Sequence, residues 1–308
     1  MIENSNDNEI DLREFFSILW QSKKVIILIT LLAAILSLGF ALTQPNIYKA
    51  TALLSPIDDE DEGGLNNLLG QFGGFANMAG ISLPSSNNIL NSELALEVIK
   101  SRAFIKEFID KHEILPYLFA IDYWDIDSRE IVLDKRVYNV NSKEWLRNVS
   151  PPKTKKPNSE EAYEEFIDIF ELEKNISNGL VTISLKHQSP DMAKQWIDWI
   201  IEDINEVMRQ KTINESQESI EYLKQQVSET NLINLDQVFF SLMQSEIQKS
   251  MLAETRKEYV LNTIDPAFAP ELKTDPFYIL IFLIGTLLGA LIAVIFVLSR
   301  HYLTKIQE

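Results

Sequence analysis

The sequence contains no cysteine. A chain without thiols has no disulfide framework, no thiol nucleophile and no zinc site of the cysteine type. Histidine is scarce too, and the three residues His112, His187 and His301 are too far apart in sequence for a local metal pair. We therefore expect no metal and no cofactor, and we expect any domain outside the cytoplasm to be held together by packing or by oligomerisation.

Basic residues are in the minority, with 28 Lys and Arg against 45 Asp and Glu and a formal net charge of -17. Because binding to phosphate backbones needs a basic face, this balance argues against a nucleic-acid partner. Charge of either sign is absent from two stretches, Val25 to Gln44 and Phe277 to Ser299. At about 1.5 Å of rise per helical residue, each can cross a hydrocarbon core of ~30 Å, so the sequence predicts two transmembrane helices.

Two spans place both chain termini on one side of the membrane. Positively charged residues flank the spans at their terminal ends, and short positive flanks normally stay in the cytoplasm. These residues are Lys23, Lys24, Arg300 and Lys305. The predicted organisation is a cytoplasmic segment (1–24), a first span (25–44), a periplasmic domain (45–276), a second span (277–299) and a cytoplasmic tail (300–308).

The N-terminal segment has two interpretations. Apolar spacing over Ile10–Trp20 predicts an amphipathic helix at the membrane surface that leads into a retained span. A cleaved signal peptide is the competing interpretation, since Gly39-Phe-Ala41 offers small residues at a cleavage site. The leader is long and acidic, whereas signal peptides are short and basic, so we favour the retained span.

The domain between the spans has the pattern of an α+β fold. Runs rich in β-favouring residues predict strands at Ile47–Ile57, Phe170–Lys174, Leu180–His187 and Tyr259–Ile264, with a turn at Asn178-Gly179. Helical periodicity predicts helices at Ser92–His112, Ser159–Asp168, Pro190–Val227 and Leu235–Lys257. The predicted buried stripe of the first helix is Leu94, Val98, Phe104, Phe108 and Ile109. Since the last strand can pair near the first, we expect a mixed sheet beside the membrane, covered by helices.

The helix that starts at Ser189-Pro190-Asp191 is the longest, and proline is tolerated there because it lies in the first turn. Its middle, Arg209 to Ser219, is polar, so the helix cannot be a core element throughout. We expect it to project as a helical arm that breaks at Asn231 or Asn234 and returns, with its apolar ends covered by the chain or by other copies. The candidates for contacts between subunits are Trp196, Ile200, Ile204, Val207, Ile220 and Leu223.

Two segments of the domain have a role that the sequence leaves open. Gly63 to Pro84 is rich in glycine but has no lysine followed by Ser or Thr, so it is not a phosphate-binding P-loop. It is either a mobile loop or a contact surface for a neighbouring subunit or the membrane. Pro151 to Pro157 (PPKTKKP) is a loop by composition, and its lysines either contact an anionic glycan or phosphate or are simply solvated.

The second span and its approach hold the remaining candidates. Pro266, Pro270 and Pro276 block regular helix and favour an extended approach to the membrane. Gly285 and Gly289 form a G-x-x-x-G pair, which lets one membrane helix come close to another. The partner is either the first span of the same subunit or a span of a neighbour.

Short motifs in order along the chain, together with the two-span layout, resemble the Wzz family of polysaccharide co-polymerases, the chain-length determinants of bacterial surface polysaccharides. The resemblance covers essentially the whole chain. The matching pieces are Ile10-Asp-Leu-Arg13, Gln71-Phe-Gly-Gly74, Ala79-Gly-Ile81, Ser101-Arg102, Ser189-Pro-Asp191 with Ala193 and Trp196, and Ile264-Asp-Pro-Ala267 with Pro270. The family's basic Pro-Lys sequence before the second span is replaced here by Asp275-Pro276-Phe277, so no basic residue is expected to act there.

This resemblance implies an inner-membrane protein whose periplasmic domains assemble into a ring-like homo-oligomer. It implies a non-enzymatic regulator of the chain length of O-antigen or a related lipopolysaccharide glycan, acting with a Wzy-type polymerase on a lipid-linked glycan. The residues agree with a non-enzymatic role, because no local pair of carboxylates is assignable as general acid and base and no nucleophile signature is present.

A tyrosine autokinase related to this family is the competing class, since there the same membrane module is fused to a nucleotide-binding domain. Residues 300–308 contain neither a Walker motif nor a tyrosine cluster. The alternative function is therefore a membrane adaptor of a polysaccharide export system that works with a separate tyrosine autokinase. A periplasmic sensor is disfavoured, because it needs a signalling domain after the second span.

Overall fold

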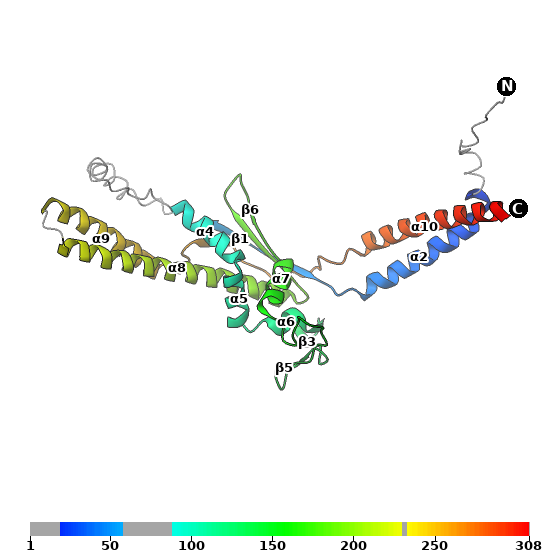
Figure 1. Ribbon diagram of the computed structural model, residues 1–308, viewed down its shortest axis with the longest axis horizontal. Helices are drawn as coiled ribbons and strands as arrows, with labels where there is room; N and C mark the ends of the chain where they lie inside the picture. Colours follow the sequence, from blue (N-terminus) through cyan, green and yellow to red (C-terminus); the bar gives the residue numbers. More distant parts are fainter. Residues whose placement is uncertain (1–18, 58–87, 230–232, 308) are drawn as a thin grey trace, which may run out of the picture. The chain divides into compact units, whose positions relative to one another are not determined.

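The structure is a computed structural model that describes residues 19–57, 88–229 and 233–307 (Figure 1). The chain forms two units, a helical unit of Met1–Ile47 with Lys273–Glu308 and an α+β unit of Tyr48–Leu272. The surface helix predicted at Ile10–Trp20 falls almost wholly outside the described residues, and the glycine-rich Gly63–Pro84 segment falls wholly outside them.

The helical unit is built on two apolar helices, α2 (Lys23–Thr43) and α10 (Tyr278–Gln307), which pack along each other. The stretches Lys23–Thr43 and Tyr278–His301 are long and apolar enough to cross a membrane, with mean hydropathies of 2.8 and 3.0. Most of their large side chains face outward from the unit. Lipid permits this pattern, because lipid tails are as apolar as leucine and remove the hydrophobic penalty for an outward-facing side chain.

The segments that follow α2 and precede α10 are held to each other within the helical unit. The Ile47 N–H donates to the Asp275 carbonyl at 2.9 Å, and the two residues form an isolated antiparallel bridge. Asn46 Oδ1 accepts hydrogen bonds from Lys273 Nζ at 3.0 Å and from the Tyr278 hydroxyl at 3.2 Å. The outgoing and returning chain therefore run side by side at this point.

The α+β unit is organised on a four-stranded sheet with the strand order β6-β7-β1-β8. The strands are β1 (Tyr48–Pro56), β6 (Phe170–Lys174), β7 (Val181–His187) and β8 (Leu261–Asp265). The α+β fold is confirmed, as is the pairing of the last strand with the first. The prediction of a mixed sheet is wrong, because all three pairings are antiparallel. A hairpin joins β6 to β7, and β1 and β8 lead away from and back to the same end of the unit, which requires opposite directions.

One face of the sheet carries the core. Alternate residues of the central strands are buried, and strand side chains alternate between faces, so the buried set lies on one face. These residues are Ala50, Ala52 and Leu54 on β1 and Val181, Ile183 and Leu185 on β7. The first turns of α8 pack against both strands. Aromatic rings extend the core, with Phe108 and Phe166 edge to face at 5.5 Å between centroids.

Two helices stand where one was predicted. α4 (Asn88–Lys100) and α5 (Arg102–Lys111) replace the single helix at Ser92–His112. Ser101 separates them, since its backbone is extended and its Oγ accepts the Phe104 N–H at 3.2 Å as an N-cap. This side-chain bond competes with continuation of α4 and starts a new helix. Leu94, predicted on the buried stripe, is 38% exposed.

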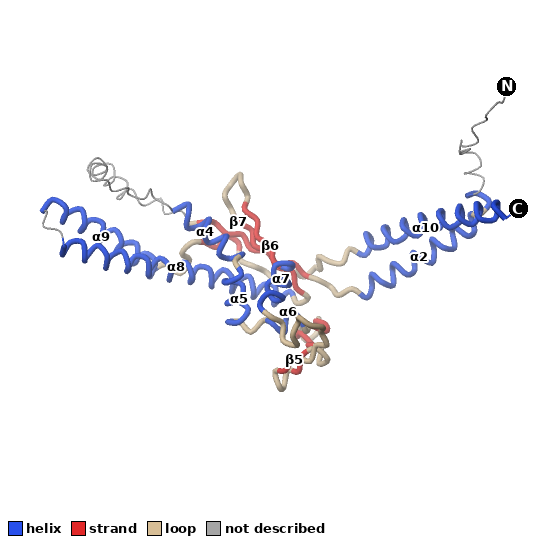
Figure 2. Tube along the Cα trace, viewed as in Figure 1, coloured by secondary structure: helices blue, strands red, loops and turns tan. Residues whose placement is uncertain are grey.

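α8 (Pro190–Glu229) and α9 (Ile233–Thr255) form a long antiparallel hairpin (Figure 2). α8 has 40 residues, which corresponds to a length of about 60 Å. Its predicted start at Pro190 is confirmed. The alternative break at Asn234 is wrong, because Asn234 lies inside α9, whereas Asn231 lies outside the described residues.

The chain between α5 and α7 (Ser159–Ile169) forms a small insertion that periodicity did not predict. It contains α6 (Leu115–Phe119), a hairpin of β2 (Ile121–Asp125) and β3 (Glu130–Leu133), and a hairpin of β4 (Tyr138–Asn139) and β5 (Glu144–Trp145). Trp124 lies edge to face with Tyr48 of β1, with 5.3 Å between centroids. Arg129 makes a two-point ion pair with Asp191 in the first turn of α8. The insertion is therefore fixed to the end of the sheet where β1 begins.

His187 ends β7 as a neutral structural residue. Its Nδ1 accepts the Ser189 N–H at 3.0 Å, which leaves Nε2 to donate to the Tyr117 carbonyl at 3.2 Å. Burial lowers the pKa of His187 to about 4, and the bonds to the Tyr117 and Ser189 backbone oppose this in part. The imidazole therefore joins the end of the sheet to α6 without carrying a charge.

A buried asparagine ties the middle of α8 to the start of β8. Asn205 is 3% exposed, and its Oδ1 accepts the N–H groups of Tyr259 and Val260 at 2.8 Å and of Leu261 at 3.1 Å. Its Nδ2 donates to the carbonyl oxygens of Ile201 and Leu261, both at 3.0 Å. These five bonds, which we call the Asn205 bracket, give partners to a turn that lies inside the core.

Replacing Asn205 by Ala should lower the free energy of unfolding by about 3 kcal/mol or more, because three buried N–H groups lose their acceptor. Chemical denaturation of the detergent-solubilised full-length chain measures the loss. Asn262 is exposed on β8 and provides the control, since Asn262→Ala should change stability by less than about 0.5 kcal/mol. Equal stability of the two variants would show that the bracket is dispensable.

Candidate functional site

Gly285 and Gly289 lie directly against α2. A Cβ atom placed on Gly285 would sit 2.2 Å from Ser37 Oγ, and one placed on Gly289 would sit 2.3 Å from Ala33 Cβ. Both separations are far below van der Waals contact, so α10 can occupy this position only where it has no side chain. Ser37 Oγ also donates to the Ile281 carbonyl of α10 at 2.8 Å. Of the two partners that the sequence left open, the glycine pair faces the first span of its own chain.

Ala33 and Ser37 are the residues of this contact that sequence reasoning missed. They lie four residues apart on α2 and are both small, so they form the small-x-x-x-small pattern that membrane helix interfaces favour. This pattern is visible in the sequence, but Ala and Ser indicate close helix packing less strongly than a pair of glycines does. Together the four residues form a packing site with small residues on both helices and one hydrogen bond across it.

The three prolines of the predicted approach to the membrane fall in different places. Residues 266–277 contain no helix, as proline favours. Pro266 and Pro270 belong to the α+β unit, and Pro266 lines a cleft there. Pro276 belongs to the helical unit and follows the bridge between Ile47 and Asp275.

Half of the predicted subunit contacts are buried inside the chain itself. Trp196, Ile200 and Ile204 are at most 1% exposed and belong to the core that α8 forms with the sheet. Enclosed side chains cannot contact another subunit, so the prediction is wrong for these three. The other candidates are half-buried: Val207, Ile220 and Leu223. The apolar period at the start of α8 marks the subunit's own core, because the sheet covers it; of the two covers that the sequence left open, the chain itself provides this one.

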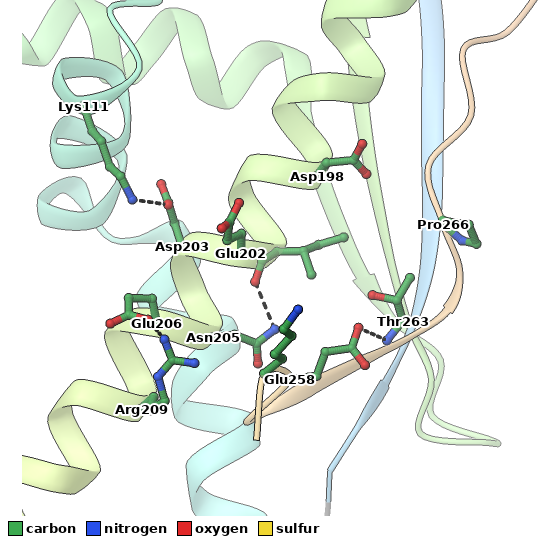
Figure 3. Close-up of a pocket in the computed structure, with 12 residues that line it drawn as sticks. Lys111, Asp198, Glu202, Asp203, Asn205, Glu206, Arg209, Glu258, Thr263 and Pro266 are labelled. Atoms are coloured by element: carbon green, nitrogen blue, oxygen red, sulfur yellow. Dashed lines mark hydrogen bonds and ion pairs between the residues drawn. The ribbon is translucent and has the colours of Figure 1, made fainter. Parts of the chain in front are cut away.

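A cleft of about 580 Å³ lies between α8, α5 and the segment that carries β8 (Figure 3). Its lining includes charged side chains of both signs: Lys111, Asp198, Glu202, Asp203, Glu206, Arg209, Lys257 and Glu258. Several are already paired within the cleft, such as Arg209 with Glu206, and Glu258 with the Thr263 N–H at 3.1 Å. Small-molecule sites place a few polar groups among apolar side chains, whereas eight of the twelve lining residues here are charged. We assign no ligand to this cleft.

Asp203, at the edge of the cleft, is a buried charge of α8. Its side chain is 7% exposed and pairs with Lys111 Nζ at 2.5 Å and with His112 Nε2 at 2.9 Å. The His112 ring stacks on Trp199 with 4.2 Å between centroids. A buried carboxylate needs such partners, since an unpaired charge is costly to desolvate. The cluster joins the end of α5 to α8.

Two of the shifted carboxylates of the α+β unit, Glu161 and Glu171, belong to ion pairs. Hydrogen bonds from Lys49 and Lys186 hold the pKa of Glu171 below its usual range, and a hydrogen bond from Arg147 does the same for Glu161. Such pairs stabilise the ionised form and do not set an acid and a base against one substrate. Within the described ranges, no group of three or more His, Asp or Glu side chains could hold a metal ion.

Replacing both Gly285 and Gly289 by Leu should force α2 and α10 apart at a cost on the order of 1–3 kcal/mol. Leucine is compatible with lipid, so membrane insertion should survive. Thermal unfolding in detergent measures the cost. Gly39 lies on α2, and an added Cβ there meets nothing within 4 Å, so Gly39→Leu is the matched control and should unfold like the natural chain. A double variant as stable as this control would mean that close packing is not required.

Comparisons with known proteins bear on the identity of the chain. Residues 8–112 match the family model of the Wzz chain length determinant protein. No curated protein gives a match. Among solved structures, the chain is similar to a full-length bacterial polysaccharide co-polymerase, with 15% identity, coverage of 96% of this chain and 99% of that chain, and a TM-score of 0.40. It is also similar to a fragment of WzzB, a polysaccharide co-polymerase from Salmonella Typhimurium, with 11% identity, coverage of 75% and 100%, and a TM-score of 0.32.

The two structural likenesses are too low to carry an argument, but the family match is specific. Its range contains four of the matching pieces quoted from the sequence, from Ile10-Asp-Leu-Arg13 to Ser101-Arg102. It also contains the first apolar helix and the first strand of the sheet. The resemblance seen in the sequence is therefore confirmed over residues 8–112, which match the chain length determinant domain of the Wzz family.

Proposed function

We propose that this protein regulates the chain length of a bacterial surface polysaccharide, O-antigen or a related lipopolysaccharide glycan, without catalysing a reaction itself. The observation that carries the proposal is the chain length determinant domain at residues 8–112. Two helices long and apolar enough to cross a membrane support a membrane-anchored regulator. The proposed partners are a Wzy-type polymerase and a lipid-linked glycan.

Deleting the gene and separating the surface polysaccharide of the cell on a gel tests the proposal. The glycan should still be made, but its length distribution should shift toward short chains or lose its preferred mode. An unchanged distribution would contradict the proposal. Loss of all exported polymer would instead favour a membrane adaptor of an export system that works with a separate tyrosine autokinase.

The helix contact in the membrane can be read on the same gel. A strain that carries the Gly285→Leu and Gly289→Leu double variant should keep near-normal membrane levels while its glycan distribution shortens or loses its mode. The Gly39→Leu control should restore the natural distribution. If the double variant also restores the natural distribution, close packing at this site is not required for control of glycan length.

We further propose that the protein lies in the bacterial inner membrane with the α+β unit in the periplasm and both termini in the cytoplasm. Positive residues at the terminal ends of the spans, such as Lys24 and Arg300, support this orientation, since short positive flanks stay inside. A reporter active only in the periplasm should work when fused after Lys156 and fail when fused after Glu308. The reverse pattern would overturn the localisation and the partners with it.

We propose a homo-oligomer in which α9 provides a contact surface. Phe240, Ile247 and Met251 are 47–60% exposed and lie seven and four residues apart, so they form one stripe on α9, the outer stripe. Another face of α9 already packs against α8. This face is buried and includes Met243 and Ala253. A second apolar stripe on a helix already packed suits a further copy of the chain.

Replacing the three residues of the outer stripe by Ser should reduce the size of the assembly, because the contact loses its apolar area. Light scattering of detergent-purified protein measures the size, and the natural chain should run as a large homo-oligomer. Ile176→Ser is the control, since Ile176 is an exposed apolar residue between β6 and β7. If the natural chain is a monodisperse monomer, the proposal of a homo-oligomer is wrong. If the triple variant forms an assembly of unchanged size, the outer stripe is not the contact surface.

A further inference from the structure

The loop at residues 151–157, PPKTKKP, is held in place from beneath by one arginine. Arg147 donates from Nε to the Lys155 carbonyl and from Nη2 to the Thr154 carbonyl, both at 2.8 Å. Its side chain is only 12% exposed. Within the loop, Thr154 Oγ1 donates to the Lys156 carbonyl at 2.6 Å. With its carbonyls bound on the inner side, the loop has a fixed backbone, and residues 151–156 are exposed.

The charge of Arg147 is used inside the protein, while the three lysines of the loop remain exposed. Its Nη1 pairs with Glu161 Oε2 at 2.9 Å, and its guanidinium lies 5.5 Å from the centre of the Phe119 ring. Glu161 is buried by this pairing and also lies 4.0 Å from Lys153 Nζ, too far for a hydrogen bond. The outward face of the loop therefore presents Lys153, Lys155 and Lys156, which we call the lysine loop.

Three ammonium groups within four residues stand out in a chain with a formal net charge of -17. Like charges in a fixed loop repel one another, so an anionic surface that faces the loop lowers its electrostatic free energy. A fixed backbone also avoids the ordering cost that a mobile polybasic segment incurs on binding.

Direct contacts connect the lysine loop to the end of the sheet where β1 begins. Tyr48 pairs with His187 in the sheet, and His187 bonds to the Tyr117 carbonyl on α6. The same short helix carries Phe119, against which Arg147 lies. A series of contacts through β7, α6 and Arg147 thus joins the loop to Tyr48, the first residue of the α+β unit.

Chain length limits the distance from that residue to the bilayer. α2 ends at Thr43, and five further residues reach Tyr48, which at full extension cover about 18 Å. The polar headgroup layer takes up roughly 5–7 Å of that distance on each side of the hydrocarbon core. By chain length, the end of the α+β unit to which the lysine loop is joined can therefore reach the membrane surface that α2 crosses.

We propose that the lysine loop binds anionic phospholipid headgroups at this surface and so restrains the α+β unit against the bilayer. A lysine near an anionic surface strengthens such binding by about fivefold, so three should change the contact equilibrium by roughly a hundredfold. The attraction falls off within a Debye length and should weaken with salt. The proposal does not depend on the glycan that the protein regulates.

The absence of cysteine allows a direct test with single labels on the full-length chain. Ser150→Cys, exposed next to the loop, carries a fluorophore in nanodiscs of phosphatidylcholine alone or mixed with phosphatidylglycerol, each with a headgroup quencher on part of the lipid. Quenching should rise strongly with phosphatidylglycerol and fall again at high salt. Ile176→Cys, at the exposed turn between β6 and β7, reports whether any change is confined to the loop.

Three variants decide the outcome on the Ser150→Cys background. Replacing Lys153, Lys155 and Lys156 by Gln should abolish the lipid dependence, whereas replacing them by Arg should keep it because the charge remains. A control that replaces Lys106, Lys224 and Lys249 by Gln makes the same change in net charge elsewhere and should behave like the natural chain. Equal quenching in the two lipids, or a lysine-loop Gln variant that quenches like the control, would overturn the proposal.

Discussion

The Asn205 bracket is the contact on which the course of the α+β unit depends. After α9 the chain has to turn into β8, and three consecutive N–H groups of that turn point into the core. Each would be costly to bury without an acceptor. One side-chain amide accepts from all three and donates to two carbonyls, so a single buried polar residue of α8 sets where β8 begins. Because β8 pairs with β1, the bracket also fixes the edge of the sheet.

The strands and the long helices could be predicted because their signals are local. β-rich runs bounded by turn residues located all four strands of the sheet, and Gly179, with φ of +72°, supplies the turn that the Asn-Gly pair indicated. Ser101 and the small hairpin of β4 and β5 in the insertion could not be found in this way. A capping serine inside a helical pattern and strands of two residues leave no period to detect.

The candidate site shows a different limit of prediction from sequence. A residue pattern identifies which face of a helix makes a contact but does not identify what that face contacts. The glycine pair predicts a close helix contact, yet only the structure selects Ala33 and Ser37 over a neighbouring subunit. The stripe of Trp196, Ile200 and Ile204 predicts an apolar contact equally well, and the contact proves to be with the subunit's own sheet. Partner identity depends on tertiary packing, which periodicity does not encode. Asn205 was detectable in principle, as a polar residue within that stripe.

α8 joins these elements because it is one continuous helix. Near its start Asp191 holds the insertion through Arg129, and further along Asp203 holds α5 and Asn205 holds β8. Its remaining length runs beside α9, which carries the outer stripe. An unbroken helix is stiff over this distance, so the part of α8 that packs against α9 and the part that positions β8 belong to one rod. The insertion, α5, β8 and α9 therefore take their places in the α+β unit from contacts with a single helix.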